Sequence, residues 1–184
     1  MNEVLKVIKS RRSVRNYKAD QISKEDLDLI IEAGIYAPTA HNDQPWHFTV
    51  IQNPEMLDYI NEISKEGMSK SEIEWVRKMG SNPNFHVSYH APTLIIVSGK
   101  EEGMAWQTDC AAAIQNILLS AESLNIGSVW LGLVSFFYEH EGSSQKIGIP
   151  EGYKPFYAVA LGYNASEKEQ AAPKRNMDVV NYIR

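Results

Sequence analysis

The sequence predicts an α+β domain in which a mixed sheet carries helices on both of its faces. Segments with strand-like composition alternate with segments of helical periodicity along the chain. Residues 93–98 form a continuous apolar run, which is typical of a strand buried on both faces. Residues 105–124 are apolar around most of the girth of a helix, which indicates burial between layers or between subunits.

Length and composition favour one domain. The chain has 184 residues, of which 43% are hydrophobic and 22% are charged, as in ordinary globular proteins. The formal net charge of -5 argues against a nucleic-acid partner, because polyanions bind basic surfaces. Basic side chains instead cluster near the two ends of the chain, in residues 9–18 and at Lys174 and Arg175. That distribution fits a small anionic ligand better than a polyanion.

Neither a membrane nor an oxidising compartment is predicted. The N-terminal residues lack the apolar core of a signal peptide, and the apolar runs fall short of the about 18 residues that a membrane helix needs. The single cysteine, Cys110, excludes an internal disulfide. We therefore expect a cytoplasmic protein without a membrane partner.

Two helices are predicted in the N-terminal part of the chain. Apolar residues at helical spacing in residues 4–8 predict a short helix whose C-terminal end delivers residues 10–15. Ser23 followed by Asp26 resembles a capping box, which predicts a second helix over residues 24–37.

The remaining elements follow the alternation of strand and helix. Asp109 and Asn116 lie inside the long apolar helix, and we expect them to be buried and to bond across an interface. Gly127 is expected to close that helix, and residues 145–148 to form a turn. Strands are predicted over residues 47–52, 93–98, 128–134 and 156–162, and a further helix begins at Pro54 after Asn53.

Residues 66–90 break the pattern. They are polar, contain glycine and proline, and carry isolated aromatic residues, among them Trp75 and Phe85. We expect a mobile lid here. Its aromatic residues have two open interpretations, which are packing onto the core and shaping of a substrate pocket.

A dense basic cluster lies in residues 8–17, which read I-K-S-R-R-S-V-R-N-Y. It combines Arg11, Arg12 and Arg15 with serine hydroxyls. Guanidinium groups are planar forked donors that match phosphate oxygens and ring carbonyls. The cluster therefore predicts an anionic ligand, although a solvated basic turn is the alternative.

A second stretch, residues 37–48, reads A-P-T-A-H-N-D-Q-P-W-H-F. It places the amides of Asn42 and Gln44 between two prolines, in a loop between a helix and a strand. Loops of this composition bind ligands more often than not. Trp46, by contrast, is expected to anchor the core, because large aromatic side chains are mostly buried.

Together these stretches resemble the FMN-dependent nitroreductase family. The family carries an R-x-S-x-R/K element, here Arg11, Ser13 and Arg15, and a P-S/T-x-x-N-x-Q-P-W loop, here residues 38–46. The resemblance continues through residues 91–97, 109–124, 125–132 and 173–180. It implies a nitroreductase-like FMN-binding fold with a mainly antiparallel sheet, an intertwined homodimer, and one domain over residues 1–184. It also implies that a C-terminal arm, residues 173–184, lies across the partner subunit.

The resemblance further implies FMN as the cofactor and NADH or NADPH as the reductant. Arg11 and Arg175 would hold the phosphate side, and Ser13 and Arg15 would lie near the ribityl chain and the N1 and O2 region. Asn42 and Gln44 would come from the loop of the other subunit, and residues 131–133 would pass under the ring. The cofactor-binding residues expected are Arg11, Arg12, Ser13, Arg15, Pro38, Thr39, Ala40, Asn42, Gln44, Leu131, Gly132, Leu133, Lys174 and Arg175.

Substrate contacts are expected from His41, Trp75 and Phe85. His41 departs from the family pattern, in which the position is usually small. No side chain is expected to act as a nucleophile, because the cofactor carries the hydride. His86 and His90 stand four residues apart, but no third ligand accompanies them, so no metal site is predicted.

The function implied is that of an FMN-dependent NAD(P)H oxidoreductase. It would pass hydride to a small electrophile, such as a nitroaromatic compound or a quinone, by a ping-pong mechanism. Two alternatives stay open. One is a flavin-dependent dehalogenase or flavin-cleaving enzyme of the same fold, and the other is a protein that binds FMN without turnover.

Overall fold

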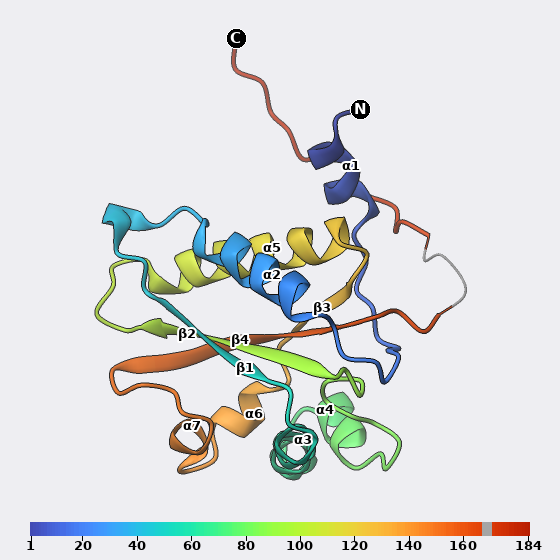
Figure 1. Ribbon diagram of the computed structural model, residues 1–184, viewed down its shortest axis with the longest axis vertical. Helices are drawn as coiled ribbons and strands as arrows, with labels where there is room; N and C mark the ends of the chain where they lie inside the picture. The colour runs from blue at the N-terminus through green and yellow to red at the C-terminus, as the bar shows by residue number, and fades with distance from the viewer. Residues whose placement is uncertain (167–170) are drawn as a thin grey trace.

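The chain folds into three layers in a computed structural model, which describes residues 1–166 and 171–184. A sheet forms the middle layer, α2 and α5 cover one face, and α3, α4, α6 and α7 cover the other (Figure 1). The elements are α1 (Glu3–Ser10), α2 (Lys24–Ile35), the 3-10 helix η1 (Ala40–Asn42), β1 (Trp46–Ile51), α3 (Pro54–Ser69), α4 (Glu74–Gly80), β2 (Thr93–Lys100), α5 (Trp106–Ser123), β3 (Gly127–Leu131), α6 (Ser135–Tyr138), α7 (Ser143–Lys146) and β4 (Tyr153–Gly162).

The sheet has the strand order β1-β2-β4-β3, and all three strand pairs are antiparallel. The α+β fold class with helices on both faces is therefore confirmed. The expected parallel component is confined, in the described residues, to one bridge between Ser13 and Ser128 at the β3 edge. The backbone N–H of Val14 donates to the Ser128 carbonyl there, at 3.0 Å.

Two apolar clusters, one on each face, explain why β2 is a continuous apolar run. Ile95 and Val97 pack with α2 and α5, and Trp46 lies in the same cluster as predicted. Leu94 and Ile96 point to the other face and pack with α3 and α6. Because successive strand side chains face opposite ways, a strand covered on both faces needs apolar residues at every position.

The predicted helix starts are confirmed. The Ser23 side chain accepts the Asp26 backbone N–H at 3.0 Å, and Asn53 accepts the N–H of Met56 at 2.8 Å. The bonds satisfy donors that a helix leaves without intrahelical partners.

The prediction that Gly127 closes the long helix is wrong. α5 ends at Ser123, and Asn125 takes the left-handed conformation with φ of 58°. The N–H of Ile126 donates to the Ala121 carbonyl at 2.8 Å, which completes a Schellman motif. Gly127 has a packing role instead, because a Cβ there would lie 3.0 Å from the Cβ of Val14.

Three other segments differ from expectation. β3 ends at Leu131, since residues 132–134 turn into α6 and the Ser135 N–H donates to the Gly132 carbonyl at 3.0 Å. Part of the turn expected at residues 145–148 belongs to α7. Residues 66–90 contain the end of α3 and the whole of α4, which pack closely, since a Cβ on Gly80 would meet the Ser69 nitrogen at 2.6 Å.

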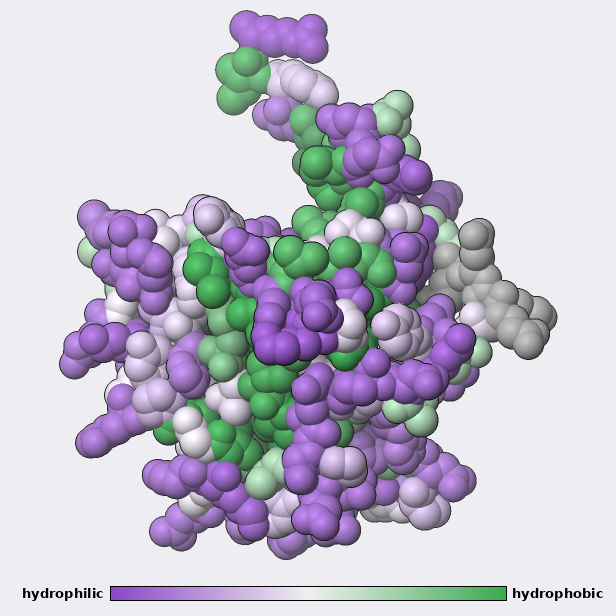
Figure 2. Space-filling model, in the orientation of Figure 1, coloured by the Kyte–Doolittle hydropathy of each residue, from purple (hydrophilic) through white to green (hydrophobic). Residues whose placement is uncertain are grey.

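Apolar side chains are exposed on α1 and on the C-terminal arm. α1 has no buried residue, and its Val4 is 66% exposed, while Met177 and Ile183 in the arm are 83% and 94% exposed. Figure 2 shows this hydrophobic surface extending from the centre of one face onto α1 and the arm. Within residues 1–166 and 171–184, no helix is long and apolar enough to cross a bilayer.

Candidate functional site

The basic cluster begins where α1 ends. Arg11 is the C-terminal cap of α1, and its backbone N–H donates to the Val7 carbonyl at 3.0 Å. The Arg12 guanidinium turns back and donates to the carbonyls of Lys9 and Arg11, at 2.7 and 2.8 Å. A cation at this end of a helix is favoured by the helix dipole. Arg12 thus contributes to the helix terminus, whereas Arg11 is half-buried at the entrance of the following segment.

Ser13 and Arg15 lie on one side of an extended segment, and Val14 is buried on the other. The guanidinium carbon of Arg15 lies 5.8 Å from the centroid of the Tyr89 ring. A guanidinium group over an aromatic face is attracted by the ring's quadrupole. Arg15 is otherwise exposed, so its charge is available to a ligand.

The end of β3 lies along the same edge of the sheet. Because Ser13 pairs with Ser128 in parallel, the chain reaches residues 131–133 about 10 Å further along that edge. Gly132 is exposed, and a Cβ on it would meet only the Tyr157 ring, at 3.7 Å. The basic cluster and residues 131–133 therefore lie along one edge of the sheet, where Gly132 is exposed and has room for a Cβ.

The amide-rich loop, residues 38–44, has an unusual backbone. His41, Asn42 and Gln44 have φ values of 52°, 60° and 44°, although none of them is glycine. A residue other than glycine in this left-handed conformation destabilises the fold by roughly 1–3 kcal/mol. Such a residue persists only where surrounding contacts hold the backbone in place. All three are exposed.

Asp109, in the first turn of α5, is buried and holds this loop. Its Oδ2 accepts the Thr39 hydroxyl at 2.8 Å and the Ala40 backbone N–H at 3.1 Å. Asn116 donates to the Ala33 carbonyl at 2.9 Å. These bonds lie within one chain, and Asn116 is half-buried where burial was expected. Bonding of the two residues across an interface stays a prediction.

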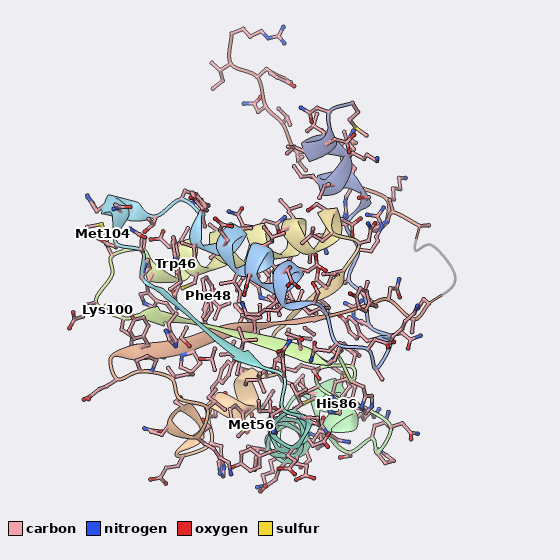
Figure 3. All side chains as sticks on the ribbon, in the orientation of Figure 1. Trp46, Phe48, Met56, His86, Lys100 and Met104 are labelled. Atoms are coloured by element: carbon pink, nitrogen blue, oxygen red, sulfur yellow. The ribbon has the colours of Figure 1, made fainter. Side chains whose placement is uncertain are left out.

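The basic cluster and the amide-rich loop lie at opposite ends of α5 (Figure 1). The loop is fixed at Asp109, and the basic cluster pairs with Ser128, which follows the C-terminal end of α5. From Asp109 to Ser123 the helix rises about 21 Å. Figure 3 places Met104 at the loop end of the molecule and His86 at the other. One chain therefore does not bring the two halves of the predicted site together.

The other predicted residues are dispersed. Lys174 and Arg175 are exposed in the arm, and residues 171–184 form no helix or strand. Trp75 is 57% exposed on α4, and Phe85 packs against Tyr89 with the ring centroids 5.9 Å apart. His41 belongs to the opposite end of the molecule.

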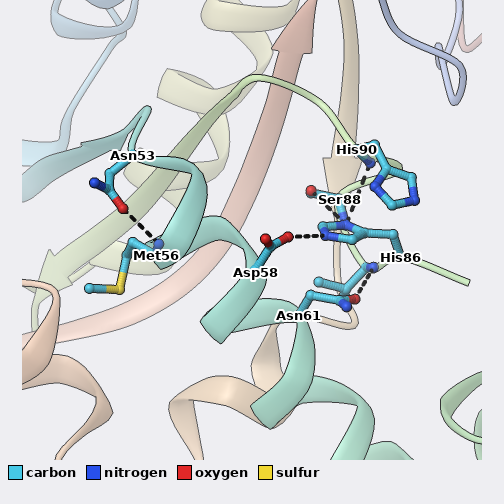
Figure 4. A network of polar contacts seen from close by, with 8 residues as sticks. Asn53, Met56, Asp58, Asn61, His86, Ser88 and His90 are labelled. Carbon is cyan, nitrogen blue, oxygen red and sulfur yellow. Dashed lines mark hydrogen bonds and ion pairs between the residues drawn. The ribbon is translucent and has the colours of Figure 1, made fainter. Parts of the chain in front are cut away.

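A polar network around His86 shapes the turn that carries Tyr89 (Figure 4). His86 Nδ1 lies 3.0 Å from the Ser88 hydroxyl, and its Nε2 lies 3.7 Å from Asp58 Oδ1. Burial, followed by the nearby His90, lowers the pKa of His86 to about 4. Tyr89 and His90 have φ values of 55° and 58°, so the turn is strained. In the described part of the chain, no group of three His, Cys, Asp or Glu side chains could hold a metal ion.

Sequence patterns did not reveal several residues next to the site. Tyr17 donates its hydroxyl to the Val14 carbonyl at 2.8 Å. Burial raises the pKa of Tyr17, and the nearby Arg15 opposes that rise. The position of Tyr17 within the basic cluster could have identified it from the sequence. No sequence pattern indicates that Tyr89 adopts a left-handed conformation. The sequence likewise gives no indication that Asp109 bonds to Thr39 and Ala40.

Known proteins share this sequence and architecture. The model of the Nitroreductase family matches residues 8–163. A candidate NADH dehydrogenase/NAD(P)H nitroreductase of Archaeoglobus fulgidus is 37% identical over 92% of this chain and 90% of its own length. A nitroreductase of Bacteroides fragilis with bound FMN has a TM-score of 0.93 and 36% identity over 100% of both chains. A nitroreductase of Desulfitobacterium hafniense with bound FMN has a TM-score of 0.87 and 30% identity, again over 100% of both chains. The chain therefore belongs to the nitroreductase family of oxidoreductases.

Proposed function

We propose that the protein is an FMN-dependent NAD(P)H oxidoreductase that reduces a small electrophilic acceptor, such as a nitroaromatic compound or a quinone. FMN, when bound, supplies the two-electron chemistry between nicotinamide and acceptor. The observation that carries the proposal is the pairing of Ser13 with Ser128. It aligns the basic cluster with residues 131–133, where Gly132 is exposed and where the flavin of this family is expected.

The residues present fit FMN. Arg11 and Arg15 offer forked donors to a phosphate and to ring carbonyls, in a protein that is acidic overall. Gly132 is exposed and carries no side chain, so its backbone is accessible to a flat ring. Lys174 and Arg175 add positive charge on an arm that is free to reach another subunit.

The proposal includes a homodimer. The amide-rich loop and the basic cluster are separated by the length of α5, so a flavin contacted by both needs a loop from a second copy. A two-fold axis then generates two identical sites. Exposed apolar residues on α1 and on the arm, including Val4 and Met177, offer surface for burial against that copy.

Arg15 has a clear electrostatic role in this proposal. A reduced flavin gathers negative charge near N1 and O2, and a guanidinium beside that region favours the charged form. The ring of Tyr89 lies 5.8 Å from the guanidinium carbon of Arg15 and favours one orientation of that side chain. Ser13 adds an uncharged donor next to it. These groups orient the cofactor and set its potential, and none of them is consumed.

One open face would serve both reactants in turn, which gives ping-pong kinetics. Nicotinamide leaves before the acceptor enters. His41, Trp75 and Phe85 are proposed to shape the acceptor pocket, with residues 66–90 as its lid. Because His41 lies at the loop end, it would meet the other two residues only across the dimer. A supply of NAD(P)H implies a cytoplasmic location.

An absorption spectrum of the purified protein tests the proposal. We expect a flavin spectrum that is bleached by anaerobic NADH or NADPH and restored by an added quinone. If neither NADH nor NADPH bleaches the flavin spectrum, the oxidoreductase proposal is wrong and the protein binds FMN without turnover. Consumption of halogenated phenols, or oxygen-dependent loss of the flavin, would instead support the dehalogenase or flavin-cleaving alternatives.

A further inference from the structure

We infer that Asp109 is the positioning residue of the amide-rich loop, and that its carboxylate determines how Asn42 and Gln44 meet the flavin. The inference rests on the proposed function, because it assigns that loop to the cofactor. Asp109 itself is buried at 6% exposure and lies behind the loop, so it acts through Thr39 and not by touching the cofactor.

A relay of hydrogen bonds connects Asp109 to the two amides. The Thr39 hydroxyl donates to Asp109 Oδ2 at 2.8 Å, and its oxygen accepts the Gln44 backbone N–H at 3.1 Å. Gln44 Nε2 then donates to Asn42 Oδ1 at 3.1 Å. The Thr39 hydroxyl is thereby occupied within the loop. Its role is to transmit the position of Asp109 and not to contact a ligand.

The relay leaves complementary groups facing outward. With Gln44 Nε2 engaged by Asn42 Oδ1, both N–H groups of the Asn42 amide remain as donors and Gln44 Oε1 remains as an acceptor. The pyrimidine edge of a flavin presents carbonyl acceptors and one N–H donor. The pair is thus matched to that edge, provided that both amides keep their orientation.

Strain explains why an anchor is required. Three residues of the loop are left-handed without being glycine, and each would relax in a free peptide. The Ala40 N–H, directly before the first of them, is held by Asp109 at 3.1 Å. At the other side of the strained residues, the Pro45 carbonyl accepts the Lys100 N–H at 2.9 Å. Asp109 and Lys100 therefore fix both ends of the strained turn.

Asp109 could stabilise only its own helix, α5, and the experiment must distinguish that effect from positioning of the amide-rich loop. A carboxylate in the first turn of a helix is favoured by the helix dipole, and removing it weakens α5 in any case. Both loop bonds, however, end on a single oxygen, Oδ2. Asp109→Asn loses the charge but keeps one oxygen that can accept both bonds, whereas Asp109→Ala loses the charge and both bonds.

The experiment compares FMN binding by the full-length wild type, Asp109→Asn, Asp109→Ala and Thr39→Val, each stripped of flavin and titrated with FMN. We expect Asp109→Asn to bind within about threefold of wild type, and Asp109→Ala and Thr39→Val to bind about tenfold more weakly or worse. The visible circular dichroism of bound flavin should change in the last two variants only, because it reports the surroundings of the ring. Thr39→Val guards against misfolding, since it leaves α5 intact.

Thr93→Val is the matched control. Thr93 is buried, and its hydroxyl contacts Gln52 and Gln21 at the opposite end of β2, so its loss costs stability without reaching the loop. FMN affinity should stay at the wild-type value. Folded Asp109→Ala with wild-type affinity, or an equal loss in Asp109→Asn and Asp109→Ala, would overturn the inference. A wild type that binds no FMN would instead refute the proposed function.

Discussion

Arg15 contacts the ring of Tyr89, with its guanidinium carbon 5.8 Å from the ring centroid, and the sequence does not predict this contact. Seventy-odd residues of chain separate them, and Tyr89 reaches its place through a strained turn with φ of 55°. Tyr89 lies between two residues, Ser88 and His90, that bond to the buried His86, and its ring contacts Arg15 of the basic cluster.

Tyr89→Leu should weaken FMN binding about two- to fivefold, because a cation–π contact at an exposed site is worth about 0.5–1 kcal/mol. Tyr89→Phe keeps the ring and should bind like wild type. Titration of the stripped proteins with FMN measures the difference. Equal affinities for the leucine and phenylalanine variants would mean that the ring does not orient Arg15.

Arg15→Ala should lower the two-electron reduction potential of the bound flavin. Removing one nearby positive charge costs on the order of 1.4 kcal/mol, which corresponds to about 30 mV for a two-electron couple. Arg15→Lys should retain part of the effect, since it keeps the charge without the planar fork. Potentials are measured against a reference dye under anaerobic conditions. Lys154→Ala, which removes an exposed cation paired with Glu101, serves as the control, and an unchanged potential in Arg15→Ala would refute the electrostatic role.

His86 should make the folded state sensitive to acid. Its pKa is lowered to about 4 by burial, with His90 and Lys65 acting in the same direction and Asp58 opposing them. A histidine in the unfolded chain has a pKa of about 6.5. Between these values the unfolded chain binds more protons, so the stabilisation present above pH 6.5 is lost as the pH falls to 4. The loss is up to about 3 kcal/mol.

His86→Asn tests this pH dependence, because its amide oxygen can replace Nδ1 as the acceptor and does not titrate between pH 4 and 7. Urea unfolding between pH 7 and 4 should show a shallower slope of unfolding free energy for this variant than for wild type. His140→Gln, at an exposed histidine, is the control and should follow wild type. Parallel curves for wild type and His86→Asn would exclude His86 as the titrating group.

Val4→Asp should shift the proposed dimer toward monomer and release FMN in parallel. Val4 is 66% exposed on α1 and lines an apolar groove with Ala33 of α2 and Leu119 of α5. A charge in that groove would cost several kcal/mol if the groove is covered by another chain. Sedimentation velocity with detection at flavin wavelengths measures both effects. Lys6→Gln changes the charge of α1 at an exposed position and should leave the assembly intact, whereas a dimeric, flavin-loaded Val4→Asp protein would place the interface elsewhere.

The sequence was informative about elements and motifs because both depend on neighbouring residues. Apolar, β-branched and aromatic composition located the strands of the sheet, and Ser23 and Asn53 marked helix starts that the structure confirms. The end of α5 was misplaced because Asn125, a residue less common than glycine in the left-handed region, provides the turn. A prediction that places helix ends at glycine fails where asparagine adopts the left-handed conformation instead.

The arrangement of the site was less predictable. Motif order along the chain says nothing about distance, and only the length of α5 puts the amide-rich loop and the basic cluster at opposite ends. Asp109 was expected to be buried, but its partner, Thr39, stands 70 positions earlier in the chain. Such partners are set by packing of α5 on the sheet, which the sequence encodes only through the whole core.

In the proposed dimer, one flavin is held by the basic cluster of one chain and the amide-rich loop of the other. The most direct test is the FMN content of a heterodimer of two differently tagged chains, one carrying Arg11→Ala and Arg15→Ala and the other carrying Asn42→Ala and Gln44→Ala. Each variant alone should bind almost no FMN. The heterodimer should hold about half the FMN of wild type, because one of its two sites is then intact. A heterodimer as empty as either homodimer would contradict the account.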